Sequence, residues 1–289
     1  SESLGDGNRI SSAEMVSALE RLAAVGITSV GALLRPGSGV WASLGNEVEI
    51  AAEAAARMPI RMGAYVIDDD PDARSLMTKA LEREGVHVIY GLLGLKTHSK
   101  VLLVLRKEGR HIRRYVHLGT GNYHHSTAKV YTDYGYMSSD KKLGQDVHKI
   151  FMQLTSLTEA RDLNLMLTSP FNLFDGVMAK IQREMELHQE YGNGLVQMKL
   201  NALEDVDVTR ALYEASRAGV QVDLVVRDTC RLRPGIEGLS ANVRVVSVVG
   251  RFLEHARVYY FHNGGDEEFF IGSADAMKRN LEHRVEVVT

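Results

Sequence analysis

The sequence has little cysteine, proline or tryptophan: its 289 residues include one cysteine, five prolines and one tryptophan. The lone Cys230 excludes an internal disulfide framework, and the first residues do not show the basic and then apolar order of a signal peptide. We therefore expect a cytoplasmic location. No apolar stretch approaches the roughly 20 residues that a membrane-spanning helix needs, so no membrane span is expected.

The sequence also lacks an overall excess of positive charge, because the formal net charge is -3. This balance gives no general reason to expect a nucleic-acid partner. The charge is unevenly spread, however. Residues 96–114 hold seven lysines and arginines against the single acidic residue Glu108, and this basic segment surrounds the short motif "HSK" at 98–100.

An internal repeat distinguishes the HSK motif from a chance basic surface. "GVHVIYGLLGLKTHSKVLLVL" (85–105) and "NVRVVSVVGRFLEHARVYYFH" (242–262) each place a strand pattern twelve residues before a histidine. His98 and His255 are each followed two residues later by a base, and then by a second apolar strand. The asparagines Asn122 and Asn280 follow 24 and 25 residues after these histidines. The sequence therefore predicts two copies of one structural unit.

The repeat extends upstream of the two histidines. "ALYEASRAGVQVDLVVRD" (211–228) and "EIAAEAAARMPIRMGAYVIDD" (49–69) both show the pattern of a helix, a glycine turn and a strand. Alternating helices and strands are typical of α/β units. We predict two similar α/β domains, at 1–160 and 165–289, with mixed, largely parallel sheets flanked by helices. Residues 140–164 are helical in pattern, and "SPFN" (169–172) interrupts that pattern.

Two His-x-Lys/Arg units are suited to phosphoryl chemistry. A neutral imidazole is a good nucleophile, and at an ordinary pKa near ~6.5 most of it is neutral at pH 7. A second histidine can protonate a leaving oxygen. Lysine, arginine and asparagine beside each histidine can offset the charge of a transferring phosphoryl group.

The order "HxK…GTGN" and then "HxR…GSAD" resembles the signature of the phospholipase D superfamily. The fuller motifs are similar to the catalytic C-terminal half of the phosphohistidine-forming polyphosphate kinases, from about residue 80 to 289. These motifs agree in order and spacing: "RRYVHLGTGNYH", "TAKVYTDYG", "SPFNL", "LYEASRAGV", "LRPGIEGLS" and "VGRFLEHARVYYFHNGG". The resemblance implies two phospholipase D-like α/β domains with an active site at their interface.

The resemblance also implies roles for single residues. His98 takes the γ-phosphate of ATP as a phosphohistidine and passes it to polyphosphate in a reversible reaction, and His255 assists proton transfer. Tyr131 and Arg227 match positions that contact the nucleotide. The polar positions implied to line the phosphate tunnel are Lys100, Asn122, Arg257, Arg279, Asn280 and Arg284. The implied partners are ATP or ADP and inorganic polyphosphate, and the full-length family implies a homo-oligomer.

Residues 1–80 diverge from the family. Arg35 in "GALLRPG" matches one of two family arginines that are associated with phosphate-bound magnesium, and Asp68 stands where the second is expected. We expect Mg²⁺ to arrive with ATP, held mostly by phosphate oxygens and water. Asp68, Asp69 and Asp70 are expected to form a solvated loop and helix N-cap.

Two other functions remain open at the level of the sequence. A phosphodiesterase of the phospholipase D type would use the same histidine pair, although Leu105 and His262 stand where its usual aspartates are expected. A non-catalytic module that binds polyphosphate or nucleotide is the other alternative, and Asp68 in place of an arginine favours it.

Overall fold

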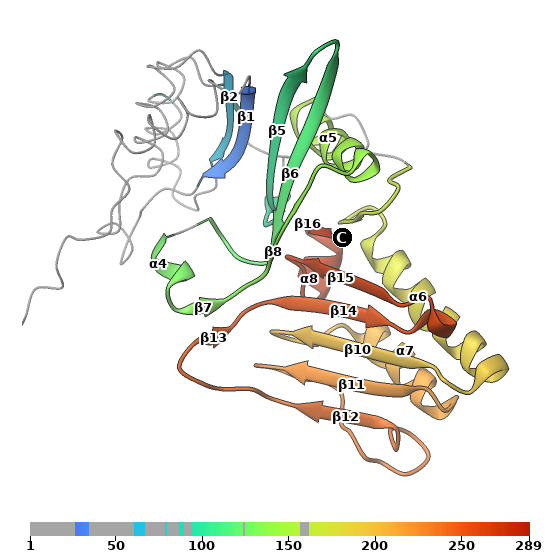
Figure 1. Ribbon diagram of the computed structural model, residues 1–289. Helices are drawn as coiled ribbons and strands as arrows, with labels where there is room; N and C mark the ends of the chain where they lie inside the picture. Colours follow the sequence, from blue (N-terminus) through green and yellow to red (C-terminus); the bar gives the residue numbers. More distant parts are fainter. Residues whose placement is uncertain are drawn as a thin grey trace, which may run out of the picture.

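The computed structural model describes 94–123, 125–156 and 162–289, residue 79, and the backbone of three strands at 27–34, 61–66 and 87–89. Within these ranges, the first half of the chain forms a six-stranded sheet in the order β3-β2-β1-β5-β6-β8 (Figure 1). Its strands are β1 (Ile27–Leu34), β2 (Arg61–Val66), β3 (His87–Ile89), β5 (Lys100–Glu108), β6 (His111–Gly119) and β8 (Gly135–Ser138).

The second half builds a larger sheet in the order β12-β11-β10-β14-β15-β16-β4, with β9 also paired to β16. Its strands are β9 (Leu167–Ser169), β10 (Leu195–Leu200), β11 (Gln221–Val226), β12 (Val243–Val246), β14 (Arg257–Phe261), β15 (Glu268–Gly272), β16 (Arg284–Val288) and the short β4 (Lys96–Thr97) from the first half.

The two sheets have the same pairing pattern. In each, three neighbouring strands are parallel, and the next pairings are antiparallel: β1 pairs β5 and β5 pairs β6, as β10 pairs β14 and β14 pairs β15. The structure confirms the mixed α/β class, with parallel pairing concentrated on one side of each sheet. Lys100 opens β5 as Arg257 opens β14, so the repeat seen in the sequence is also a repeat of topology.

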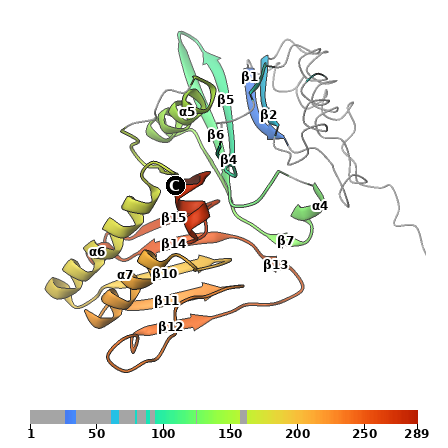
Figure 2. The same cartoon turned by 180° about the vertical axis from the view of Figure 1, so that it is seen from behind.

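Three longer helices cover one side of the sheets, as Figure 2 shows most clearly. They are α5 (Lys141–Ser156), α6 (Leu173–Tyr191) and α7 (Val206–Arg217). Asp205 caps α7 by accepting the amides of Asp207 and Val208, and a glycine turn leads from α7 to β11, as the pattern of 211–228 predicts. The predicted helix within 140–164 is observed as α5, which ends at Ser156 before residues outside the described ranges.

Short elements complete the described part. They are α4 (His125–Ala128), β7 (Tyr131–Thr132), β13 (Leu253–Glu254), the 3₁₀ turn η2 (Asn263–Gly265) and α8 (Lys278–Glu282). None of the helices in the described ranges is long and apolar enough to cross a membrane.

The two halves share a hydrophobic core. One cluster joins Val101 and Leu103 of β5 and Val147 of α5 to Val285 and Val287 of β16. Full burial of a valine side chain contributes about 1.5–3 kcal/mol, so these contacts hold the end of the chain firmly against the first half. This shared core fixes β16 beside the segment that carries His98.

Candidate active site

The chain segment before each histidine crosses to the other half of the molecule. β4 ends one residue before His98 and pairs in parallel with β16, while β13 ends immediately before His255 and pairs in parallel with β7. Each histidine therefore lies just before a long strand of its own sheet, β5 or β14, and just after a short strand that pairs with the other half. The polar HSK motif precedes a buried strand because it lies at this interface.

His98 is held by the second half at both its backbone and its ring. The amides of His98 and Ser99 donate to the carbonyl oxygen of Val285, at 2.9 and 3.0 Å. The Nδ1 atom of His98 lies 2.9 Å from Oε2 of Glu286, the next residue. Because a carboxylate only accepts, Nδ1 carries the hydrogen, and Nε2 is left with its lone pair.

His255 is held by the first half in the same way. Its amide and that of Ala256 donate to the carbonyl oxygen of Thr132, at 3.2 and 3.0 Å. Its Nδ1 atom lies 2.8 Å from Oδ1 of Asp133, again the next residue. The two histidines thus exchange equivalent contacts across the interface between the repeats.

The carboxylate partner of His98 is completely buried, since Glu286 has an exposed fraction of 0%. Asn280 donates to its Oε1 at 2.6 Å, and the hydroxyl of Ser273 donates to Oε2. Both partners are on the second half, near β15 and β16. They fix the carboxylate, and the carboxylate in turn fixes the orientation of the His98 ring.

Burial keeps His98 neutral. Desolvation, and then the positive charge of Lys100, lower the pKa of His98 to about 4, although Glu286 acts in the opposite direction. A neutral imidazole with a free lone pair is the form that attacks phosphorus. His98 therefore has the protonation state and tautomer of a nucleophile at neutral pH.

His255 has a different environment on its second nitrogen. Arg257 Nη1 lies 3.0 Å from His255 Nε2, and it also donates to the carbonyl oxygens of His255 and Thr120. Desolvation by burial is the largest effect on the pKa of His255 and lowers it, against the raising effect of Asp133. His255 is thus an acceptor for an arginine rather than an open nucleophile.

Asp133 stays ionised beside His255. Burial acts to raise the pKa of Asp133, but hydrogen bonds from His255 and Thr120, together with the positive charge of Arg257, hold that pKa below its ordinary value. Thr120 Oγ1 donates to Asp133 at 2.6 Å. An ionised acceptor at Nδ1 prepares His255 to take or give a proton at Nε2.

Two buried cations, Lys100 and Arg257, act electrostatically on both histidines. Lys100 and Arg257 each act to lower the pKa of His98 and of His255, which places both charges within electrostatic range of both rings. Arg257 is anchored by Asp275, with Nη2 at 2.8 Å from Oδ2, and the Lys100 ammonium donates to the His98 carbonyl oxygen. The structure thus brings the four predicted residues into one site with a positive field that suits a phosphoryl group.

Tyr131 and Arg227 line a cleft of about 600 Å³ that opens beside His255. The rings of Tyr131 and His255 have their centroids 5.0 Å apart, and Arg227 Nε donates to Asn201 Oδ1 at 2.9 Å. Val248 and Phe252 add apolar wall to this cleft. Its lining also holds the cation Arg251 and the acids Asp228 and Glu254. An apolar wall with cations beside it can receive the base and phosphates of a nucleotide.

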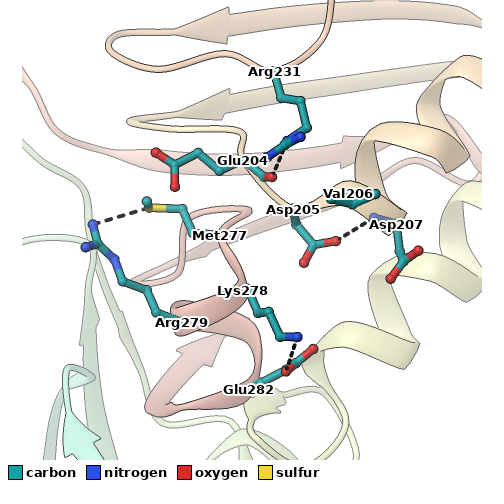
Figure 3. A pocket seen from close by; sticks show the side chains of 9 residues that line it. All are labelled: Glu204, Asp205, Val206, Asp207, Arg231, Met277, Lys278, Arg279 and Glu282. Carbon is teal, nitrogen blue, oxygen red and sulfur yellow. Dashed lines mark hydrogen bonds and ion pairs between the residues drawn. The ribbon is translucent and has the colours of Figure 1, made fainter.

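The other predicted phosphate contacts lie in different surroundings. Asn280 is buried and bonded to Glu286, so it supports His98 from behind, whereas Asn122 is half-buried just after β6. Arg284 opens β16 opposite Lys96. Arg279 is exposed and lines another cavity, of about 370 Å³, together with Glu204, Arg231 and Lys278 (Figure 3). Neither histidine lines that cavity.

Arg35 and the three aspartates Asp68, Asp69 and Asp70 lie outside the described residues. In the part that is described, no group of three or more histidine, cysteine, aspartate or glutamate side chains is arranged to hold a metal ion. The carboxylates of Asp133, Glu286 and Asp275 are already bonded to His255, His98 and Arg257, respectively. The described residues therefore do not form a resident magnesium site.

The sequence interpretation did not identify the two carboxylates. A glutamate inside "RVEVV" and an aspartate two residues after Tyr131 were the available signals. A charged residue in a β-branched strand is rarely buried without a partner, so Glu286 in particular could have been found.

Family models match most of the chain. The model for polyphosphate kinase C-terminal domain 1 matches residues 69–160, and the model for C-terminal domain 2 matches residues 166–289. The chain belongs to the polyphosphate kinase family. The matched ranges correspond to the C-terminal part of that family, as the motifs around His98 and His255 indicate.

Curated polyphosphate kinases match at about half identity. The chain is 52% identical to the one from Prosthecochloris aestuarii over 219 residues, which cover 76% of this chain and 31% of that protein. It is 47% identical to the one from Xylella fastidiosa over 243 residues, covering 84% and 33%, respectively. The chain thus spans about a third of the length of these relatives.

Solved structures agree with the fold. The polyphosphate kinase from Porphyromonas gingivalis matches with a TM-score of 0.82 and 30% identity, over 96% of this chain and 42% of that one. Phosphatidylserine synthase from Haemophilus influenzae matches with a TM-score of 0.58 and 11% identity, over 96% and 80%, respectively. At that identity, the second likeness shows a common fold alone.

Proposed function

We propose that this chain transfers the γ-phosphoryl group of ATP to polyphosphate through a phosphohistidine on His98, in a reversible reaction. The observation that supports this proposal most is the state of His98. The ring is largely but not fully buried and is neutral, its Nδ1 hydrogen is directed at Glu286, and its Nε2 lone pair is available. Family membership supplies ATP and polyphosphate as the proposed partners.

In the first step, Nε2 of His98 attacks the γ-phosphorus. An N–P bond forms while the bond from the γ-phosphorus to the β,γ-bridging oxygen breaks, and ADP leaves with that electron pair. The imidazole becomes cationic as the N–P bond forms, and the Glu286 carboxylate at Nδ1 offsets this charge. Lys100 and Arg257 offset the negative charge of the transferring group.

In the second step, a terminal oxygen of polyphosphate attacks the phosphohistidine. The P–N bond breaks, its electron pair returns to the imidazole, and the polyphosphate is longer by one phosphate. His255, with Asp133 at Nδ1, is proposed to accept or return a proton at Nε2 once a phosphate draws Arg257 away. Tyr131 and Arg227 are proposed to hold the nucleotide in the cleft that they line.

Three further properties are proposed by the resemblance. Mg²⁺ accompanies the nucleotide and is held by phosphate oxygens and water, since the described residues offer no cage for it. The protein acts in the cytoplasm, where ATP is supplied. The longer proteins of the family form homo-oligomers, and no nucleic-acid partner is proposed.

Labelling with γ-labelled ATP tests the proposal. We expect label that is stable in alkali and lost in acid, as phosphohistidine is, and that is absent from His98→Ala. Chase with ADP should return the label to ATP, and chase with polyphosphate should move it to the polymer. Equal labelling of His98→Ala would refute the assignment of His98 as the phosphate acceptor. Release of nucleoside monophosphate from a diester substrate would contradict the kinase assignment and favour the phosphodiesterase.

A further inference from the structure

The tip of the β5–β6 hairpin carries a concentration of positive charge. This basic hairpin tip, residues 106–114, holds five arginines and lysines against Glu108 alone. Figure 1 shows the hairpin reaching beyond its neighbouring strands at one end of the molecule. The tip is distant along β5 from Lys100 and His98, so the catalytic site does not account for its charge.

The single acid is shared by two arginines. Arg106 and Arg113 are opposite each other in the register, and they approach Glu108 at 3.4 and 3.5 Å. The hydroxyl of Tyr115 also donates to Glu108, and this bond is the largest effect that lowers the pKa of the carboxyl group. Glu108 is therefore ionised but already surrounded by donors.

Two cations of the basic hairpin tip face solvent. Lys107 and Arg110 are exposed, and within the described residues neither has a hydrogen bond or ion pair. If these two side chains bound a phosphate, no existing hydrogen bond or ion pair would have to break. They are the part of the tip that is free to bind an anion.

The corresponding hairpin of the second repeat has the opposite charge. From the end of β14 to the first residue of β15 the chain reads "HNGGDEE" (262–268), and Glu268 is paired with Lys180 at 2.9 Å and with Arg183 at 2.5 Å. The repeated scaffold therefore does not require a basic tip. The positive charge is a property of the first hairpin alone.

We propose that the basic hairpin tip is a second anchoring site for the polyphosphate chain, a proposal that rests on the proposed function. β5 runs nine residues from Lys100, beside His98, to Glu108. At a rise of about 3.4 Å per residue, this separates the tip from the histidine site by roughly 27 Å. A polyphosphate long enough to reach both sites gains affinity from the second contact, whereas a short one cannot.

Polyphosphate fits the tip better than a nucleic acid does. Proteins that bind single strands combine positive charge with aromatic rings on which bases stack. Next to the tip, the centroid of the Tyr115 ring lies 5.6 Å from the Arg113 guanidinium, and the Tyr115 hydroxyl is bonded to Glu108. Ile112 is exposed but has no ring, and His111 carries the one exposed ring among residues 106–114, so successive bases have no row of rings to stack on.

The test compares Lys107→Gln/Arg110→Gln with a control, Arg210→Gln/Arg217→Gln, which removes the same charge from α7. Binding of long-chain polyphosphate and of tripolyphosphate is measured over a salt series. We expect the hairpin variant to bind the long chain about tenfold more weakly at low salt, with a salt slope lower by about 1.4, roughly 0.7 for each lost phosphate contact. The control should be unchanged, as should tripolyphosphate binding and ATP labelling in both variants.

The proposal is overturned if the long chain binds the hairpin variant normally, if the control loses as much, or if tripolyphosphate binding falls equally. It is also overturned if single-stranded DNA competes for the tip as strongly as polyphosphate does. Absence of ATP labelling in the parent chain would contradict the proposed function instead, and the binding comparison would still decide the role of the hairpin.

Discussion

The two histidines have the same architecture but different surroundings. Each receives a backbone anchor and a carboxylate from the opposite repeat, at Val285–Glu286 for His98 and at Thr132–Asp133 for His255. The difference lies at Nε2, where His255 meets Arg257 while His98 keeps its lone pair. A duplicated scaffold thus supplies two similar imidazoles, and the side chains around them assign different chemical roles.

Removing each imidazole in turn should give the largest effects and tests whether the two histidines have different roles. His98→Ala should abolish labelling from ATP, because it removes the Nε2 lone pair that is proposed to accept the phosphoryl group. His255→Ala should keep labelling on His98 but slow transfer by about 10²–10⁴-fold, the usual range for a general acid or base. Rapid-quench labelling separates the two results, and equal loss in both variants would refute the division of roles.

Neutralising the carboxylates is expected to have the next largest effect. Glu286→Gln places an amide where three donors converge, so we expect labelling to fall by about 10²-fold or more and stability to fall by about 1–3 kcal/mol. Asp133→Asn should affect stability less, because Asp133 is partly exposed. Urea unfolding and the pH profile of labelling report the two effects. A Glu286→Gln variant that is normal in both would rule out its positioning role.

The pH dependence of the free energy of unfolding should reveal the lowered pKa of His98. The pKa of His98 is about 4 in the folded chain against about 6.5 when unfolded, so the unfolded state binds more protons between these values. Stability should therefore fall as pH falls from 6.5 toward 4, by up to about 3 kcal/mol from this residue. Denaturant titrations of the parent and of His98→Asn measure it, and the same pH slope in both would contradict the assignment.

Loss of the Tyr131 hydroxyl should have the smallest effect. Tyr131→Phe keeps the ring that packs near His255 and removes one neutral hydrogen-bonding group from the cleft. We expect nucleotide affinity to fall by about 0.5–1.5 kcal/mol, with labelling of His98 retained at saturating ATP. Calorimetric binding of ATP gives the affinity. Lost labelling at saturation would instead indicate that Tyr131 acts on His255.

The sequence by itself determined the repeat. Equal spacing from strand to histidine, and a base two residues after each histidine, predicted the two topologically equivalent sheets and the positions of Lys100 and Arg257 at the first residues of β5 and β14. Strand periodicity is a local property, so it can be recognised without knowledge of what lies across the interface.

The pairing of each histidine with a carboxylate was decided only by the tertiary structure. Glu286 is 188 residues from His98, and Asp133 is 122 residues from His255. No periodicity connects such positions, because their contact depends on β4 joining β16 and on β13 joining β7. The tertiary fold also places Arg279 in a cavity that neither histidine lines, and it leaves Nε2 open on His98 while Arg257 meets Nε2 of His255, since burial and neighbouring charges are properties of the assembled interface.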